Sequence, residues 1–141
     1  MSREDRRGPR PASPVAAVGI DHVRLAYHYL DTGDIDAYGS LLAEHALMYQ
    51  PESPPCHGRA EILRLQASSP GPPAGHQIYK IFAADDAVAV TGRRTPRPGH
   101  DGVDRAGVDF ADIFTLTDEG LLLARRRYYY VAPPSYGANE D

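Results

Sequence analysis

The chain has 141 residues, of which 42% are hydrophobic, and this size and composition suit one domain with one core. Its formal charge of −4 at neutral pH gives no electrostatic reason to bind nucleic acid or an anionic membrane. A single cysteine, Cys56, excludes an internal disulfide, so the composition favours a cytoplasmic protein.

The two ends of the sequence differ from its middle. Residues 1–16 combine Arg, Pro, Ser and Gly with almost nothing to bury, and residues 133–141 have the same character. We predict that both are flexible tails flanking a domain at 17–132. Neither the first tail nor any later stretch has an apolar run long enough to span a bilayer, so no membrane partner is expected.

Two helices are predicted at the start of the domain. The first covers 18–31, where apolar residues recur at the spacing of one helical face: Ile20, Val23, Tyr27 and Leu30. Gly33 provides a stop signal, and Asp34 provides an N-cap for a second helix over 35–42. The apolar stripe of this second helix contains Ile35, Tyr38, Leu41 and Leu42.

A short strand and a third helix follow. The apolar run at 46–50 ends at Pro51, and the Pro and Ser residues after it predict a surface loop. Helical spacing returns at 59–66 and stops at the Pro-Gly-Pro-Pro sequence of 70–73.

From Gly75 onward the pattern changes to that of strands. Residues 77–84 and 87–95 form a predicted hairpin that turns at Asp85 and Asp86. After a Pro- and Gly-rich interruption at 96–107, a second hairpin is predicted from the segments 108–117 and 121–131.

Three local sequences in this order resemble the SnoaL-like members of the nuclear transport factor 2-like superfamily. They are YLDTGD at 29–34, HGRAEI at 57–62 and DIFTLTDEG at 112–120. The resemblance implies a cone-shaped α+β barrel, with three N-terminal helices packed on a curved mixed or antiparallel sheet. It also implies a homodimer and a pocket for a small hydrophobic or polycyclic molecule, which agrees with the cone that a bent sheet forms on helices.

Asp112 is the main candidate for chemistry. Alternation along 110–114 places Phe110, Asp112 and Phe114 on one face of a strand. If that face lines a pocket, desolvation raises the pKa of the carboxyl unless a nearby cation reverses the shift. By resemblance, Asp112 matches the strand aspartate that serves as acid/base in SnoaL-type polyketide cyclases and as an oxyanion-hole acid in ketosteroid isomerases. The alternative is a solvent-facing carboxylate paired with an arginine on the neighbouring strand.

The last strand offers two faces with similar chemistry. Arg125, Arg127 and Tyr129 share one face, and Arg126 shares the other with two tyrosines. The resemblance to ketosteroid isomerases puts the first set on the pocket side, together with Leu121 and Leu123. Arg127 beside Asp112 would hold the carboxylate ionised and favour a base or an anion-steering role over a neutral proton donor. The alternative is a solvated basic stripe, which we favour for Arg126.

Two departures argue against isomerase activity. Gln50 stands where ketosteroid isomerases carry their general-base aspartate, and glutamine cannot take a proton from carbon. Their first-helix tyrosine matches Ala26, with Tyr27 next to it. Gln50 could instead orient a substrate carbonyl or a water, or be an ordinary residue at a strand end.

The histidines and tyrosines give weaker signals. None of the six histidines has a spacing typical of zinc ligands, so no metal is expected. His57 and His76 are possible pocket bases, although a capping or surface role is favoured for both. Four tyrosines could lend a hydroxyl to a ligand or serve only as core residues: Tyr27, Tyr49, Tyr79 and Tyr129.

The leading hypothesis is an enzyme of secondary metabolism: a cyclase, an isomerase or a hydratase of the lyase class. It would act on a polyketide-like carbonyl compound without a cofactor. Asp112 would transfer the proton and Arg127 would stabilise the oxyanion. The other site residues would contact substrate or exclude water: Tyr129, Gln50, Tyr27, Tyr49, Phe110 and Phe114. The alternatives are a metabolite-binding protein without turnover and a structural dimerisation domain.

Overall fold

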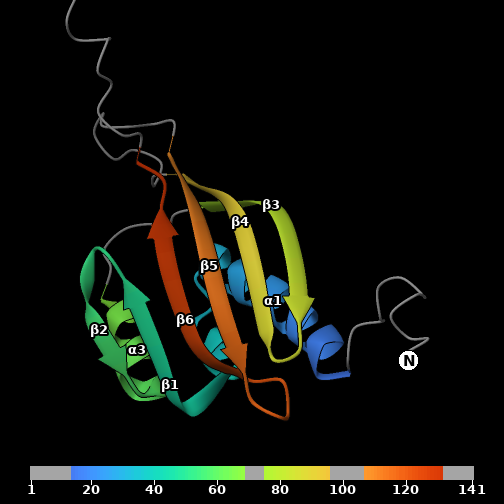
Figure 1. Ribbon diagram of the computed structural model, residues 1–141. Coiled ribbons are helices and arrows are strands. Elements are labelled where there is room, and N and C mark those ends of the chain that lie inside the picture. The colour runs from blue at the N-terminus through green and yellow to red at the C-terminus, as the bar shows by residue number, and fades with distance from the viewer. Residues whose placement is uncertain (1–13, 69–74, 96–106, 132–141) are drawn as a thin grey trace, which may run out of the picture.

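In a computed structural model of the chain, three helices pack on a six-stranded sheet (Figure 1). The structure describes residues 14–68, 75–95 and 107–131. The helices are α1 (Pro14–Thr32), α2 (Ile35–Gly39) and α3 (Arg59–Ala67). The strands are β1 (Leu42–Gln50), β2 (Ser53–His57), β3 (Gly75–Ala84), β4 (Ala87–Thr95), β5 (Val108–Leu116) and β6 (Leu122–Tyr129).

Helix α1 begins at Pro14, inside the predicted first tail, and Ala16 is already buried. Proline suits the first turn of a helix, because its fixed φ is helical and the missing N–H has no partner there. The rest of the predicted tail, and the whole predicted tail at 133–141, lie outside the described residues.

The corner between α1 and α2 has the predicted chemistry. Gly33 has a φ of 79°, which an L side chain rarely adopts, and it allows the chain to turn out of α1. The side chain of Asp34 accepts a hydrogen bond from the Ala37 N–H at 3.2 Å, as an N-cap does. Val23 and Tyr27 lie buried on the predicted face of α1. The prediction of two helices meeting at this corner is confirmed.

Helix α2 is shorter than predicted, because it ends at Gly39 rather than at residue 42. Leu41 and Leu42 are buried, as the apolar stripe required, but strand β1 already begins at Leu42. The Leu41 carbonyl accepts a hydrogen bond from the Leu122 N–H at 2.9 Å, so this stretch is bound to β6. A buried leucine pair fits a helix or a strand equally well, and here the pairing with β6 makes this stretch part of the sheet.

The loop predicted after Pro51 contains a strand, β2, paired antiparallel with β1. Pro54 and Pro55 hid this strand from the sequence analysis, since proline cannot donate to a sheet ladder. Strand β2 lies at the edge of the sheet, where one side of the ladder needs no donor. Cys56 points from β2 into the core opposite Met48.

The strand order in the sheet is β2-β1-β6-β5-β4-β3. Strands β1 and β6 run parallel and every other neighbouring pair runs antiparallel, so the sheet is mixed. Both predicted hairpins are present, with β3 turning into β4 and β5 into β6. The cone-shaped α+β architecture is confirmed, but the sheet is an open one and does not close into a barrel.

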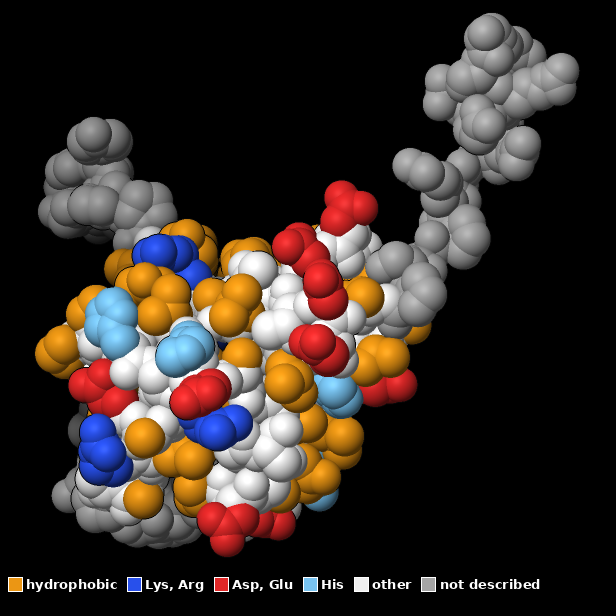
Figure 2. Space-filling model, turned by 90° about the horizontal axis from the view of Figure 1, so that it is seen from below, with side chains coloured by type: hydrophobic (Ala, Val, Ile, Leu, Met, Phe, Trp, Pro, Cys, Tyr) orange, Lys and Arg blue, Asp and Glu red, His pale blue; other side chains and the backbone are white. Residues whose placement is uncertain are grey.

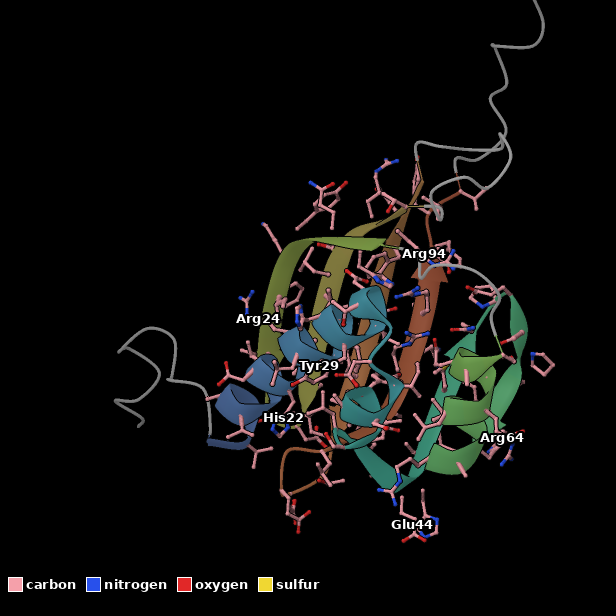
Figure 3. The ribbon with its side chains drawn as sticks, turned by 180° about the vertical axis from the view of Figure 1, so that it is seen from behind. His22, Arg24, Tyr29, Glu44, Arg64 and Arg94 are labelled. Atoms are coloured by element: carbon pink, nitrogen blue, oxygen red, sulfur yellow. The ribbon has the colours of Figure 1, made fainter. Side chains whose placement is uncertain are left out.

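Viewed from behind, the helices lie across one face of this sheet (Figure 3). Helix α1 contacts β3, β4 and β6, while α3 contacts β1 and β2. His22, near the middle of α1 (Figure 3), connects the helix to the β5–β6 turn, because its Nδ1 lies 2.7 Å from the Gly120 carbonyl oxygen. The core therefore lies between the helices and the hollow face of the sheet.

Close packing on that face depends on Gly92 in β4. A Cβ at this position would lie 2.3 Å from the Gln77 carbonyl oxygen and 3.1 Å from the Phe110 ring. The register of β3 against β4 also shifts between Ile78 and Lys80, beside Gly92. The missing side chain thus lets β3 bend over β4 and leaves room for the Phe110 ring.

The surface seen from below carries acidic side chains scattered among hydrophobic ones (Figure 2). This mixture agrees with the negative formal charge of the sequence. Of the helices that the structure describes, none is long and apolar enough to cross a membrane.

Candidate functional site

The candidate site lies where β5 and β6 face the helices. Phe110, Asp112 and Phe114 are buried on the inner face of β5, whereas Ile113 between them is exposed. The alternation in the sequence predicted this orientation, and it results from the two-residue period of a strand.

Strand β6 places its two buried arginines directly opposite these residues. Arg127 pairs with Asp112 across the ladder, and Arg125 pairs with Phe114. Arg126 between them is exposed, so the arginine set that faces inward is the predicted one.

The predicted alternation does not extend to the start of β6. There Leu122 is buried, whereas Leu121 and Leu123 were expected on the inner face. A register shift opposite Thr115 and Leu116 changes the side on which these leucines lie.

Asp112 is completely buried and accepts three hydrogen bonds. Arg127 donates from Nε to Oδ1 at 2.8 Å and from Nη2 to Oδ2 at 2.7 Å. The Tyr27 hydroxyl, brought by α1, donates to Oδ2 at 2.5 Å. These three donors fix the carboxylate on both of its oxygens.

The surroundings of Asp112 decide its charge. Burial by itself would raise the pKa of this carboxyl, but the hydrogen bonds from Arg127 and the charges of Arg125 and Arg127 outweigh it and hold the pKa below its ordinary value. Burial likewise acts to lower the pKa of Arg127, and the bond to Asp112 reverses the shift and raises it. Asp112 is therefore ionised at neutral pH, so it can accept a proton but has none to donate.

Aromatic rings enclose the ion pair. The guanidinium carbon of Arg127 lies 4.4 Å from the centre of the Phe110 ring, a distance typical of a cation–π contact. The Tyr27 and Phe114 rings meet edge to face with their centres 6.0 Å apart. These rings exclude water from the pair and explain why burial raises the pKa of Tyr27.

A small cavity of about 10 Å³ lies beside this cluster, near Arg125. Its polar lining comes from Arg125 and Tyr38, and Asp112 is not among the residues that line it. The remaining lining is apolar: Leu42, Ala46, Leu47, Met48, Ile62, Phe114, Leu122 and Ala124. A volume of this size suits about one water-sized group.

The other predicted site residues divide between the two faces of the sheet. Gln50 points inward, where its Oε1 accepts a hydrogen bond from Arg125 Nη2. Tyr129 is half-buried at the end of β6, and its hydroxyl donates to Glu52 Oε2 at 2.6 Å. Neither side chain contacts Asp112 directly.

Two of the predicted tyrosines lie away from the site. Tyr49 is on the outer face of β1, where the Arg126 guanidinium stacks 4.2 Å from the centre of its ring. Tyr79 is half exposed on β3, and its hydroxyl donates to Asp109 Oδ1 at 3.3 Å. Alternation puts odd and even residues of a strand on opposite faces, so neither can share a ligand with Asp112.

A histidine that the sequence analysis considered but did not favour lies next to the cluster. His76 Nδ1 is 2.6 Å from Asp31 Oδ1, and the His76 ring centre is 5.2 Å from that of Tyr27. Burial lowers the pKa of His76 even though Asp31 opposes the shift. His57, in contrast, is exposed, and its backbone N–H donates to the side chain of Glu61. Asp31 and His76 are 45 residues apart, so no local pattern connects them.

Within the described residues, no three His, Cys, Asp or Glu side chains come together as a possible metal site. Cys56 is buried, and burial raises the pKa of its thiol. The chemical groups in and next to the cluster are the Asp112 carboxylate, two guanidinium groups, several phenols and the His76 imidazole with its partner Asp31.

Comparison with known proteins supports the fold. The model of the SnoaL-like domain family matches residues 23–124. No curated protein matches the sequence. Among solved structures, a protein from Kribbella flavida provisionally named a ketosteroid isomerase has a TM-score of 0.69 at 21% identity, over 86% of this chain and 87% of that one.

Two further solved structures are similar. A protein from Jannaschia sp. CCS1, provisionally named a SnoaL-like polyketide cyclase, has a TM-score of 0.69 at 18% identity, over 86% of this chain and 91% of its own. The protein TerC, co-crystallised with polyporic acid, has a TM-score of 0.68 at 16% identity, over 80% of this chain and 92% of its own. At these identities the likeness concerns the fold alone.

Proposed function

This chain belongs to the SnoaL-like domain family, and we propose that it binds a small carbonyl compound on the hollow side of its sheet and takes a proton from it with Asp112. The observation that carries this proposal is the complete burial of an ionised carboxylate against Arg127 and Tyr27.

A buried ion pair is a poor way to stabilise a fold, because the cost of desolvating two charges offsets most of their attraction. Apolar side chains of similar volume would pack the same space at no such cost. Ionisable groups with shifted pKa values inside a concave fold are instead typical of functional sites. The Asp112–Arg127 pair is therefore best explained by the chemistry that it serves.

The charge state of Asp112 selects its role. A carboxylate held ionised by Arg127 is a proton acceptor, so the proposed step is abstraction of a proton next to the substrate carbonyl. The C–H bond next to the carbonyl breaks, and its electron pair forms the enolate with the negative charge on the carbonyl oxygen. The proton is transferred to the Asp112 carboxylate. Because Tyr27 occupies Oδ2, the substrate either displaces this hydroxyl or passes its proton through it to Asp112.

The walls of the site and the similar solved structures support a proposal for the kind of substrate. Apolar side chains dominate the inner face, which favours a hydrophobic body with few oxygens. TerC was co-crystallised with polyporic acid, and the Jannaschia protein is provisionally named a polyketide cyclase. We therefore propose a cyclic or polyketide-like carbonyl compound as the substrate class.

A second candidate function is binding without turnover. It is favoured by the full burial of Asp112, which already accepts three hydrogen bonds from the protein, and by its absence from the lining of the cavity. In this case the ion pair would only fix the walls of a binding site.

Deuterium exchange separates these two functions without knowledge of the product. Carbonyl compounds that raise the melting temperature are incubated with the protein in D2O, and mass spectrometry follows deuterium uptake next to the carbonyl. We expect uptake with the wild type and at least a 100-fold slower uptake with Asp112→Asn, at similar ligand affinity. Arg126→Gln, on the exposed face, is the matched control and should exchange at the wild-type rate.

The exchange experiment has two contrary outcomes. Binding without uptake by the wild type supports the second function, whereas equal uptake by wild type and Asp112→Asn removes Asp112 from the mechanism. If no compound binds, both functions fail and a structural role gains.

The homodimer remains a prediction, and the outer face of the sheet supports it. Phe82 on β3 and Ile113 on β5 are exposed large apolar residues. They lie on either side of Ala89 on β4, so the three form one row across the sheet. An apolar sheet face of this kind usually marks an interaction site. We expect Ile113→Lys to shift the protein toward the monomer in sedimentation experiments. A wild type that is already monomeric would disprove the prediction.

A further inference from the structure

Arg125 is a buried cation for which the described residues supply no counter-ion. Its side chain is on the inner face of β6, and the residue is only 7% exposed. Within the part of the chain that the structure describes, the ion pairs are His76–Asp31, Arg93–Asp109 and Arg127–Asp112, and none of them includes Arg125. The partner that Arg125 does have is the neutral amide of Gln50.

One donor of Arg125 has no partner at all. Its Nε is buried and makes no hydrogen bond, and it is the one such side-chain atom among the described residues. A buried donor left unsatisfied costs about 1–3 kcal/mol, and an uncompensated charge costs more. Such a donor is usually explained by a bound water, ion or ligand that supplies the missing acceptor.

The neighbouring cluster does not supply this acceptor, because Asp112 is hydrogen-bonded to Arg127 and Tyr27 and not to Arg125. Asp112 already accepts three hydrogen bonds, two of them from Arg127. Its single negative charge faces two buried arginines, so the inner face carries one excess positive charge. The missing partner is therefore expected to carry one negative charge.

A second donor faces the same space as Arg125. Tyr38 on α2 is buried, it lines the cavity together with Arg125, and the described part of the chain offers no hydrogen bond to its hydroxyl. Burial raises the pKa of Tyr38, and the nearby charge of Arg125 opposes that shift. Two unused donors thus converge on one small cavity with apolar walls.

We infer that the cavity beside Arg125 and Tyr38 binds the anionic oxygen of a small organic monoanion, a carboxylate or an enolate. Arg125 is the counter-ion and Tyr38 donates the second hydrogen bond. This inference rests on the proposed function, because it assigns the polar end of the same ligand. An enolate oxygen formed when Asp112 takes a proton would be stabilised here.

The size of the cavity limits what enters it. About 10 Å³ accommodates one oxygen-sized group, so the body of the ligand must displace side chains. Met48 lines the cavity and is the adaptable residue there, since its unbranched side chain has three rotatable bonds. A phosphate, with more charge and more oxygens, suits this apolar space and its single free arginine less well.

The test compares carboxylates with amides of the same shape. Acetate, butyrate and benzoate are titrated against acetamide, butyramide and benzamide, and calorimetry gives each dissociation constant. We expect the wild type to bind at least one carboxylate 10-fold or more tightly than its amide. Arg125→Met should abolish this preference, and Tyr38→Phe should weaken carboxylate binding about threefold to tenfold.

Two further variants keep the test decisive. Arg126→Met removes an exposed arginine from the adjacent position and should retain the full preference for carboxylates. Arg125→Lys keeps the charge with different geometry and should restore part of the preference, which also controls for misfolding of Arg125→Met. The inference is overturned if the wild type shows no preference, or if Arg125→Met keeps the wild-type preference.

The outcome is separable from that of the proposed function. If Arg125 is required for carboxylate preference but no carbonyl compound takes up deuterium, the anion site is supported and proton transfer by Asp112 is contradicted. If deuterium uptake depends on Asp112 while carboxylates and amides bind equally tightly, proton transfer is supported and the anion site is contradicted.

Discussion

Arg125 and Arg127 are the same residue type on the same face of β6, yet their surroundings differ. Arg127 makes two hydrogen bonds to Asp112 and stacks on Phe110. Arg125 is almost as deeply buried, but it reaches only the amide of Gln50 and a cavity. The register of the β5–β6 ladder causes this difference, because it sets Asp112 opposite Arg127 and Phe114 opposite Arg125.

The contrast shows how to separate structure from binding among buried charges. Where a buried charge is fully paired inside the protein, removing it lowers the free energy of unfolding, because its partner is left buried and uncompensated. A buried charge that is not paired lowers the free energy of unfolding of the free protein. A ligand that supplies the missing partner raises it again. Substitutions at the two arginines should therefore have opposite effects on stability.

The largest expected effect is that of Arg127→Met. Removing this arginine leaves Asp112 buried without its counter-ion, so the free energy of unfolding should fall by about 3–5 kcal/mol. Chemical denaturation followed by circular dichroism measures the change. Arg126→Met, at an exposed position, should stay within about 0.5 kcal/mol of the wild type. A loss below about 1 kcal/mol for Arg127→Met would show that Asp112 is easily neutralised.

The two buried tyrosines sharpen the comparison. Tyr27→Phe removes a hydrogen bond to an ionised carboxylate, and the free energy of unfolding should fall by about 1–3 kcal/mol. Tyr38→Phe removes a hydroxyl without a partner in the described residues, so it should change stability by less than about 0.5 kcal/mol. Equal losses for both variants would contradict the assignment of Tyr38 to the ligand.

Arg125→Met should act in the opposite direction. It replaces an unpaired buried cation with an apolar side chain, so without ligand the free energy of unfolding should stay the same or rise by about 1 kcal/mol. The same denaturation measurement applies. A fall of 2 kcal/mol or more would mean that Arg125 already has a full set of partners in the free protein.

Acid should have the smallest effect within the range where the rest of the protein stays folded. The pKa of Asp112 is lowered in the folded state, so its contribution to stability is present above the unfolded value of about 3.9 and is lost as pH falls through the folded value. Below pH 4 the free energy of unfolding should therefore fall more steeply in the wild type than in Asp112→Asn. Parallel curves would place the folded pKa of Asp112 near its ordinary value.

Much of the fold was accessible from the sequence. Helical spacing found the buried face of α1, and alternation found both hairpins and the inward side of Asp112. Strand β2 was missed because its two prolines disguise an edge strand. The end of α2 was placed too late, because a buried leucine pair fits a helix and a strand equally well.

The contacts of the site were less accessible, because they connect distant parts of the chain. Tyr27 and Asp112 are 85 residues apart, and Asp31 and His76 are 45 apart. A strand pattern gives the face on which a side chain lies, but only three-dimensional packing gives the helix that covers it. Tyr38 appeared in the sequence as one of several core residues for the same reason.

The position of β6 also bears on how the protein is made. This strand lies between β1 and β5 in the sheet, yet it follows all the other strands along the chain. During translation, we therefore expect the β1–β2 hairpin and the β3–β4–β5 unit to have unpaired strand edges until β6 has been synthesised. A nascent chain halted before Leu122 presents these edges to other chains, so we expect it to depend on chaperones until β6 joins the two pieces.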